Sequence, residues 1–207
     1  MNQIFEDYIE HIPASEEPLS SDVFIIRGER YNWVYDTGRC DEAFERLAAV
    51  PDKRIILSHF HPDHTLNVKR LDYDALYIGK NTFKYLKRGA ILEEACEFED
   101  GVRLKIMPMP SSHAKGTLVL LLNGKYLFSG DGFYPELKGK ELRYNVTILK
   151  EQIDFLKSAD AKFVCLSHRD RPVLPKRVVI KLLEGIYELR QKDEPYVYVK
   201  DALGTTV

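Results

Sequence analysis

The stretch Ser58–Thr65 (SHFHPDHT) holds three of the six histidines in this chain of 207 residues. His59 and His61 alternate, so an extended segment or a tight loop directs both rings toward one point. The proline that follows ends strand pairing and forces a turn, and Asp63 and His64 come after it. This turn therefore offers two imidazoles to one metal ion, and a carboxylate with an imidazole to another. Such donors suit zinc, iron or manganese.

A metal site also needs ligands from elsewhere in the chain. His113 lies in a polar loop between two expected strands, and Asp131 and His168 each follow a short apolar run, as His59 does. Each residue taken singly is equally compatible with a capping residue or a surface histidine. The shared placement of His59, Asp131 and His168 at strand ends favours coordination, because binding residues gather where strands end. The remaining histidine, His11, lies in an acidic amphipathic leader and is interpreted as a surface residue.

Length and composition limit the remaining choices. A chain of this length with 44% hydrophobic residues predicts one globular domain over residues 1–207. The net charge of −2 is small, and the charges are interspersed, which disfavours nucleic acid and membranes as partners. The N-terminus shows no apolar signal segment, and the longest apolar run, Leu118–Leu122, is too short to span a bilayer. We therefore expect a cytoplasmic protein with a small-molecule substrate; no pattern indicates the oligomeric state.

Hydrophobic spacing predicts the elements around these residues. We expect a hairpin over residues 22–38, a helix over 41–49, short strands at 54–57 and 75–79, and a helix that Gly89 ends. The pair Asn123-Gly124 predicts a two-residue hairpin turn. Residues 132–144 form a polar segment, and amphipathic helices follow near residues 146 and 175.

Each half of the chain runs through a similar order of elements. Two strands lead to an acidic residue with glycine, at Asp36-Thr37-Gly38 and at Asp131-Gly132, and a helix and a short strand follow. Each half then reaches Leu-Ser-His, at residues 57–59 and 166–168. Two similar β-rich units covered by helices fit a four-layer sandwich around one shared core.

With these landmarks in order, the chain resembles the metallo-β-lactamase fold superfamily. The resemblance rests on Asp36, the motif His59-x-His61-x-Asp63-His64, His113, Asp131 and His168. It implies an α/β fold, a four-layer αβ/βα sandwich with two mixed β-sheets flanked by helices. It also implies two divalent metal ions, zinc foremost, with iron or manganese as alternatives.

The resemblance assigns a role to each of these residues. The first ion would be held by His59, His61 and His113, and the second by Asp63, His64 and His168. Asp131 would bridge the two ions. Asp36 would brace the histidine loop from behind, although a hairpin-turn role explains this residue equally well.

The activity that the resemblance implies is hydrolysis by a binuclear centre that supplies a hydroxide nucleophile. The substrate would be a small ester, thioester, lactone or phosphoester, and Asp63 would act as the catalytic carboxylate by orienting the nucleophile or passing a proton. The antibiotic-hydrolysing members typically carry cysteine where Asp131 stands, which argues against β-lactam hydrolysis. The fold itself hosts many reactions and does not select among them.

Substrate contacts are expected from the segment 132–144 and from the loop that follows His113. The candidates are Lys115, Tyr134, Lys138, Arg143 and Tyr144. Cations there would favour an anionic substrate, and the same residues are equally compatible with a solvated surface loop.

Three other functions remain open. The fold also hosts mononuclear iron oxidoreductases of the sulfur dioxygenase kind, which is the main alternative. Diiron reductases usually carry glutamate where His61 stands, and their fused flavin domain is missing from this sequence. A nuclease is disfavoured by the near-neutral charge, and a non-catalytic binding module by the complete set of ligands.

Overall fold

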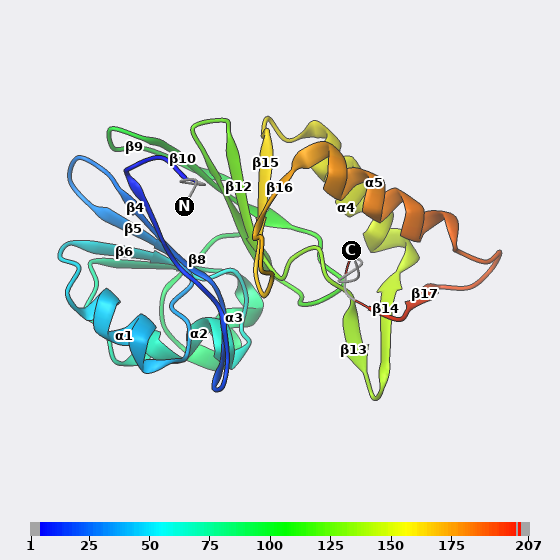
Figure 1. Cartoon of the computed structure of the whole chain (residues 1–207), viewed down its shortest axis with the longest axis horizontal. Helices are drawn as coiled ribbons and strands as arrows, with labels where there is room; N and C mark the ends of the chain where they lie inside the picture. The colour runs from blue at the N-terminus through cyan, green and yellow to red at the C-terminus, as the bar shows by residue number, and fades with distance from the viewer. Residues whose placement is uncertain (1–4, 202, 204–207) are drawn as a thin grey trace.

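Two six-stranded β-sheets pack face to face, and helices cover the outer face of each (Figure 1). The computed structural model describes residues 5–201 and residue 203. The first sheet has the strand order β1–β4–β5–β6–β7–β8, and the second has the order β16–β15–β12–β11–β10–β9. Each sheet contains both parallel and antiparallel pairs. The mixed α/β sandwich predicted from the sequence is therefore confirmed.

The first sheet consists of β1 (Ile9–Ile12), β4 (Val23–Arg27), β5 (Asn32–Tyr35), β6 (Lys53–Ile56), β7 (Ala75–Ile78) and β8 (Ala90–Ile91). The second consists of β9 (Cys96–Glu99), β10 (Arg103–Met109), β11 (Thr117–Leu122), β12 (Tyr126–Gly130), β15 (Phe163–Leu166) and β16 (Val173–Pro175). The smaller strands are β2 (Ser15–Glu16), β3 (Leu19–Ser20), β13 (Glu136–Lys138), β14 (Glu141–Asn145) and β17 (Tyr196–Val199). The helices are α1 (Asp41–Ala48), α2 (Pro62–Thr65), α3 (Lys80–Leu86), α4 (Val146–Ser158) and α5 (Lys176–Glu188), with a 3₁₀ turn over Leu66–Lys69.

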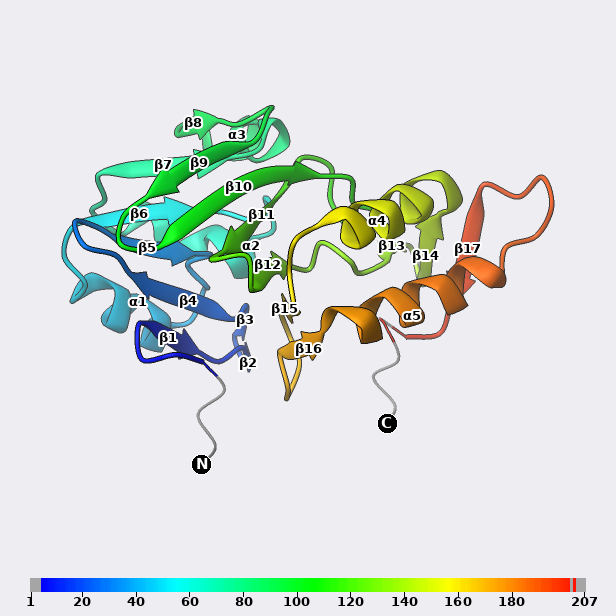
Figure 2. The same ribbon diagram turned by 90° about the horizontal axis from the view of Figure 1, so that it is seen from above.

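Side chains that alternate along the strands divide the core into three layers. In β4, Phe24 and Ile26 face the second sheet, whereas Val23 and Ile25 face the helices α1 and α3. In β11 the residues likewise alternate between the layer shared by the two sheets and the layer under α4 and α5. Figure 2 shows the two sheets between these groups of helices. The alternation makes four structural layers, as expected.

Some local expectations need correction. Helix α3 ends at Leu86, because Lys87 takes the left-handed conformation with φ of 58°, and Gly89 lies beyond the helix. The loop at Asn123-Gly124 has three residues, since Leu122 pairs with Tyr126. The segment 132–144 was expected to be a polar loop, yet it contains the hairpin β13–β14, which pairs with β17.

Two parallel strand pairs bring the important residues to strand ends. β5 runs parallel to β6 in the first sheet, and β12 runs parallel to β15 in the second. Asp36 and His59 follow the first pair, and Asp131 and His168 follow the second. Because parallel strands end at the same edge of their sheet, each acidic residue lies beside a histidine loop. None of the described helices is long and apolar enough to cross a membrane.

A buried carboxylate joins the two sheets at the side of the sandwich opposite to these strand ends. Asp100, in the turn between β9 and β10, accepts hydrogen bonds from Trp33 Nε1 at 3.0 Å and from the backbone nitrogens of Arg30 and Tyr31 at 2.9 and 3.1 Å. Gly28 leaves room for it, since a Cβ there would lie 2.3 Å from a carboxylate oxygen. Burial alone would raise the pKa of Asp100, but these hydrogen bonds hold it below its ordinary value.

We predict that Asp100→Asn lowers the free energy of unfolding at pH 7 by about 1–3 kcal/mol, because the amide nitrogen faces donors and leaves them unpaired. The pKa of Asp100 is lower in the folded chain than in the unfolded chain. Its contribution is therefore present above about pH 4 and is lost as the pH falls through the folded value. Urea unfolding at pH 7 and at about pH 3 measures the difference between wild type and variant, which should shrink in acid.

The exposed Asp72 provides the matched control. Asp72→Asn should change stability by less than about 0.5 kcal/mol. Equal stability of wild type and Asp100→Asn at pH 7 would contradict the role assigned to this carboxylate.

Candidate metal centre

Seven side chains that can bind metals converge where the two sheets meet. The first group is His59, His61 and His113, and the second is Asp63, His64, Asp131 and His168. Within each group, the potential ligand atoms lie within 4.8 Å of one another. All seven residues are ones that the sequence indicates: four from the motif, His113 from the polar loop, and Asp131 and His168 from the ends of strands.

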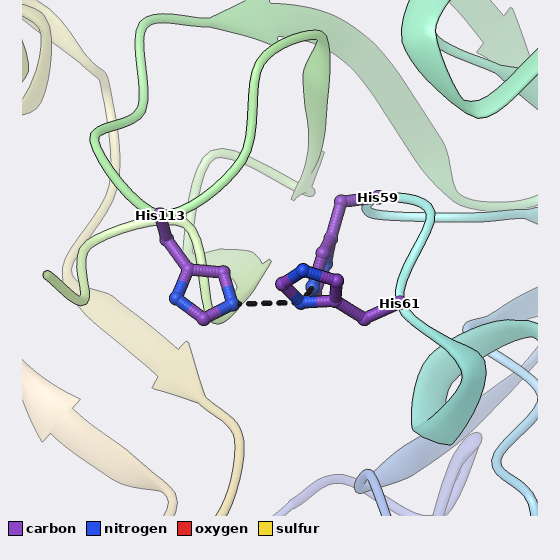
Figure 3. A group of neighbouring side chains, drawn as sticks. All are labelled: His59, His61 and His113. Atoms are coloured by element: carbon purple, nitrogen blue, oxygen red, sulfur yellow. Dashed lines mark hydrogen bonds between the residues drawn. The ribbon is translucent and has the colours of Figure 1, made fainter. Parts of the chain in front are cut away.

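In the first group, three imidazole nitrogens meet at short range. His61 Nδ1 lies 2.9 Å from His59 Nε2 and 3.0 Å from His113 Nε2. Figure 3 shows His59 and His61 extending from one loop and His113 from another, with the three rings turned toward one another. Two nitrogens bound to a tetrahedral zinc ion lie roughly 3.3 Å apart. The spacing therefore fits one ion with three imidazole ligands.

Neighbouring groups fix which nitrogen of each ring faces the centre. Ser58 Oγ donates to Asp36, so it accepts from His59 Nδ1 at 2.9 Å. His113 Nδ1 donates to the carbonyl oxygen of Pro135 at 3.0 Å. In the neutral rings, both Nε2 atoms are therefore unprotonated, which is the form that binds metal.

The second group contains two buried polar atoms that have no hydrogen-bond partner among the described residues. His64 Nε2 lies 3.3 Å from Asp131 Oδ2 and 3.4 Å from Asp63 Oδ2, and His168 Nε2 lies 3.1 Å from the same oxygen of Asp63. Among the described residues, neither His64 Nε2 nor Asp131 Oδ1 has a hydrogen-bond partner, although both atoms are buried. Unpaired buried polar atoms are costly, and a cation held between these donors would satisfy them.

Asp131 lies between the two groups. Its Oδ2 atom is 3.5 Å from His113 Nε2 in the first group, and 3.3 and 3.7 Å from His64 Nε2 and His168 Nε2 in the second. One carboxylate therefore reaches donors of both groups. This position suits a ligand that two ions share.

Asp36 supports the centre from behind the histidine loop. Its carboxylate accepts hydrogen bonds of 2.7 Å from Ser58 N and from Ser58 Oγ, and it lies 2.7 Å from His64 Nδ1. The bond to Nδ1 turns His64 Nε2 toward the second group. Asp36 also follows its hairpin strand with φ of 58°. The same residue is therefore both a turn residue and the support of the histidine loop.

The charges in the two groups differ. Burial lowers the pKa of His59 well below its ordinary value and also lowers that of His61, which favours the neutral form of these two rings. Burial would also lower the pKa of His64, but Asp131 and Asp36 raise it well above the ordinary value. The pKa of Asp131 lies far below its usual range despite burial, because His64 is beside it. Without metal, a proton on His64 partly balances these carboxylates.

Sequence reasoning missed the support of the last ligand. Asp22, buried directly before β4, accepts hydrogen bonds from His168 N at 2.9 Å and from Ser167 Oγ at 3.1 Å. These bonds hold His168 in the left-handed conformation, with φ of 58°, which is unusual for a residue other than glycine. The repeated Leu-Ser-His was the available signal, since Ser58 and Ser167 each bind a supporting aspartate.

His11 is not the surface residue expected from the sequence. Its ring is half-buried, and its Nε2 lies 2.5 Å from Asp22 Oδ1. It lines a cavity of about 800 Å³ that also contains metal-centre residues from both groups. The rest of the wall comes mainly from residues 13–19 around the hairpin β2–β3 and from residues 169–172.

The expected substrate contacts lie elsewhere. Tyr144 is fully buried and donates to the carbonyl oxygen of Phe133, so it cannot touch a substrate in this structure. Tyr134 is also buried, and its hydroxyl donates to the carbonyl oxygen of Ser167, beside a metal-centre residue. Both tyrosines were expected to contact substrate because no local pattern indicates that their segment folds back onto the core.

The three cations proposed as substrate contacts do not line the large cavity either. Lys138 is exposed on β13. Lys115 and Arg143 line a separate cavity of about 470 Å³, which shares His113 with the larger one. Arg143 pairs with Glu136 there, with Nε 2.8 Å from the carboxylate. The Lys115 and Arg143 positions remain beside the centre, but on the other side of His113.

We predict that Asp36→Asn weakens metal binding by about 10–100-fold while the fold is retained, because His64 loses the acceptor that orients it. Titration of the metal-free protein with zinc in competition with a chelator measures the affinity. Asp41→Asn, which removes an exposed carboxylate at the start of α1, should leave the affinity unchanged. Wild-type affinity in Asp36→Asn would show that the bond to His64 Nδ1 does not prepare the site.

Comparisons with known proteins give a uniform result for the fold. No model of a protein family matches the sequence, and no curated protein is significantly similar to it. Solved structures are similar in three dimensions. A metallo-β-lactamase superfamily protein from Sulfolobus tokodaii is 17% identical with a TM-score of 0.58, over 90% of this chain and 89% of that one.

Two further structures extend the comparison. A metallo-β-lactamase from Pontibacter korlensis is 16% identical with a TM-score of 0.60, over 88% of this chain and 97% of that one. A flavo di-iron protein variant from Thermotoga maritima is 15% identical with a TM-score of 0.68, over 92% of this chain but 62% of that longer one. Identities this low establish architecture and leave the reaction open. The chain has the metallo-β-lactamase fold.

Proposed function

We propose that this protein is a hydrolase with a binuclear metal centre that cleaves a small ester, thioester, lactone or phosphoester. One observation carries the proposal: two groups of donors lie side by side and share the carboxylate of Asp131. A single structural ion would need only one such group, whereas two adjacent ions suit hydrolysis.

The donor set determines what bound ions would contribute. Two divalent ions held by these residues would lower the pKa of water to about 7 and polarise the bond under attack. The buried Asp36 and Asp22 keep His64 and His168 in place, so little reorganisation is required during the reaction. Zinc is the first choice because imidazole nitrogens dominate the donor set.

Asp63 is the proposed catalytic carboxylate. Burial would raise its pKa, but the hydrogen bond with His168 holds it below its ordinary value, so the group is ionised at neutral pH. It borders the cavity that holds the metal-centre residues. An ionised carboxylate there can orient an attacking water molecule and accept its proton.

The cavity suits a small molecule. Its volume of about 800 Å³ lies within the usual range for such sites. Its wall carries one arginine, Arg169, against several carboxylates, and this is unlike a phosphate-binding track for a nucleic acid. We therefore propose a small-molecule substrate.

Iron-dependent oxidation is the second candidate, since flavo di-iron proteins share the fold. Metal analysis of protein purified without added metal separates the two proposals. We expect about two zinc ions per chain, together with hydrolysis of at least one substrate in a panel of esters, thioesters, lactones and phosphodiesters. One iron per chain with oxygen consumption on persulfides would instead establish the oxidoreductase.

We predict that His61→Ala reduces hydrolysis by more than about 100-fold, because a direct ligand contributes more than the groups behind it. The variant should also bind less metal while it keeps the circular dichroism spectrum of the wild type. His11→Gln is the matched control for metal content, since His11 belongs to neither group of donors. Full activity and full metal content in His61→Ala would remove this residue from the centre.

A further inference from the structure

His11 occupies a fixed position on the first sheet. It lies on β1 opposite Phe24 of β4, and its ring stacks on the Phe24 ring with centroids 4.8 Å apart and planes 12° apart. The ring of Phe5 contacts it edge-on at 5.8 Å. These aromatic contacts hold the imidazole in one plane.

A buried carboxylate determines the orientation of the ring within that plane. His11 Nε2 lies 2.5 Å from Asp22 Oδ1. Asp22 is only 2% exposed, and its second oxygen already accepts from Ser167 Oγ and His168 N. Because an ionised carboxylate can only accept, His11 must donate from Nε2.

The other ring nitrogen, Nδ1, is unpartnered within the part of the chain that the structure describes and is accessible on a residue that lines the cavity. Among the described residues, no group is hydrogen-bonded to His11 Nδ1, and this atom is not among the buried atoms without partners. His11 and Asp22 line the same cavity as His61, Asp63 and Asp131. The other charged groups on this wall are Glu16, Arg169 and Asp170. The cavity therefore has a metal centre and, separately, an oriented imidazole.

We propose that His11 is a catalytic residue that passes a proton through Nδ1 to the leaving group, with Asp22 as the group that holds its ring. This inference rests on the hydrolase function proposed above. A carboxylate that orients an imidazole, whose second nitrogen meets the substrate, is an established arrangement for proton transfer.

The step moves one proton from the attacking oxygen to the leaving oxygen. The hydroxide oxygen forms a bond to the carbonyl carbon, and Nδ1 then takes the proton that this oxygen still carries. The bond between this carbon and the leaving oxygen then breaks, and its electron pair remains on that oxygen. Nδ1 returns the proton there, so the leaving group departs as an alcohol and the ring is again neutral. No oxidant, reductant or further reactant is required.

The variant His11→Gln tests the step, because the glutamine amide can still donate to Asp22 but carries no group that exchanges a proton at the position of Nδ1. Two esters with the same acyl group are compared, one with a 4-nitrophenyl leaving group and one with an alkyl leaving group. Nitrophenolate leaves without a proton, whereas an alkoxide needs one. We expect kcat/KM to fall by about 100-fold or more for the alkyl ester, and by less than about 3-fold for the nitrophenyl ester.

Leu19→Ala is the matched control, since Leu19 lies on the same cavity wall, is 51% exposed and has no proton to transfer. It should change both esters by the same factor. Equal losses for both esters in His11→Gln, or no loss, would overturn the proton-transfer role and leave the hydrolase function intact. A wild-type protein that is loaded with zinc but cleaves neither these esters nor the wider panel would overturn both.

A second readout does not depend on activity. Nitrogen-15 spectra of the imidazole rings in the metal-free protein, assigned by the signal missing from His11→Gln, report which nitrogen carries the proton. We expect the neutral ring of His11 to be protonated at Nε2 and bare at Nδ1. A proton at Nδ1 in the neutral ring would contradict the orientation on which the inference depends.

Discussion

The carboxylate of Asp36 is the constraint on which the candidate metal centre depends. One of its oxygens accepts from Ser58 N, while the other lies within hydrogen-bonding distance of Ser58 Oγ and His64 Nδ1. Because Ser58 Oγ in turn accepts from His59 Nδ1, one buried group orients a ligand in each of the two donor groups. Gly130 approaches closely from the second sheet: a Cβ there would lie 2.8 Å from Ser58 Oγ. Close approach at this point brings Asp131 up to the histidine turn.

The second half of the molecule repeats this serine–aspartate arrangement with a different aspartate. Ser167, like Ser58, precedes a metal-centre histidine and binds an aspartate, but this aspartate is Asp22 from the first sheet. The first sheet thus supplies both supporting aspartates, Asp36 for its own histidine loop and Asp22 for the histidine that follows a strand of the second sheet. It also places His11, the remaining contact of Asp22, on the cavity wall.

Sequence reasoning predicted the fold and singled out the seven side chains that the structure brings together, because their signals are local. The motif from His59 to His64 occupies one turn, and Asp131 and His168 each follow an apolar strand that can be recognised from a few residues. The support by Asp22 could not be read in this way, because its bonds to Ser167 and His168 join residues 145 and 146 positions apart. His11 was misinterpreted for the same reason, since its surroundings depend on Asp22 and on the pairing of β1 with β4.

The segment 132–144 shows a different limit. Its lysines, arginine and tyrosines suggested a loop over the centre, yet β14 pairs with the distant strand β17 and draws Tyr144 into the core. Composition describes the surface of such a segment, whereas long-range strand pairing decides which of its side chains are buried.

The central claim is that two metal ions share Asp131, and anomalous X-ray diffraction at the zinc edge from crystals of zinc-loaded protein tests it most directly. The account predicts two anomalous peaks per chain, one contacting His59, His61 and His113 and the other contacting Asp63, His64 and His168, with Asp131 in contact with both. A single peak, or a pair of peaks that Asp131 does not join, would contradict it.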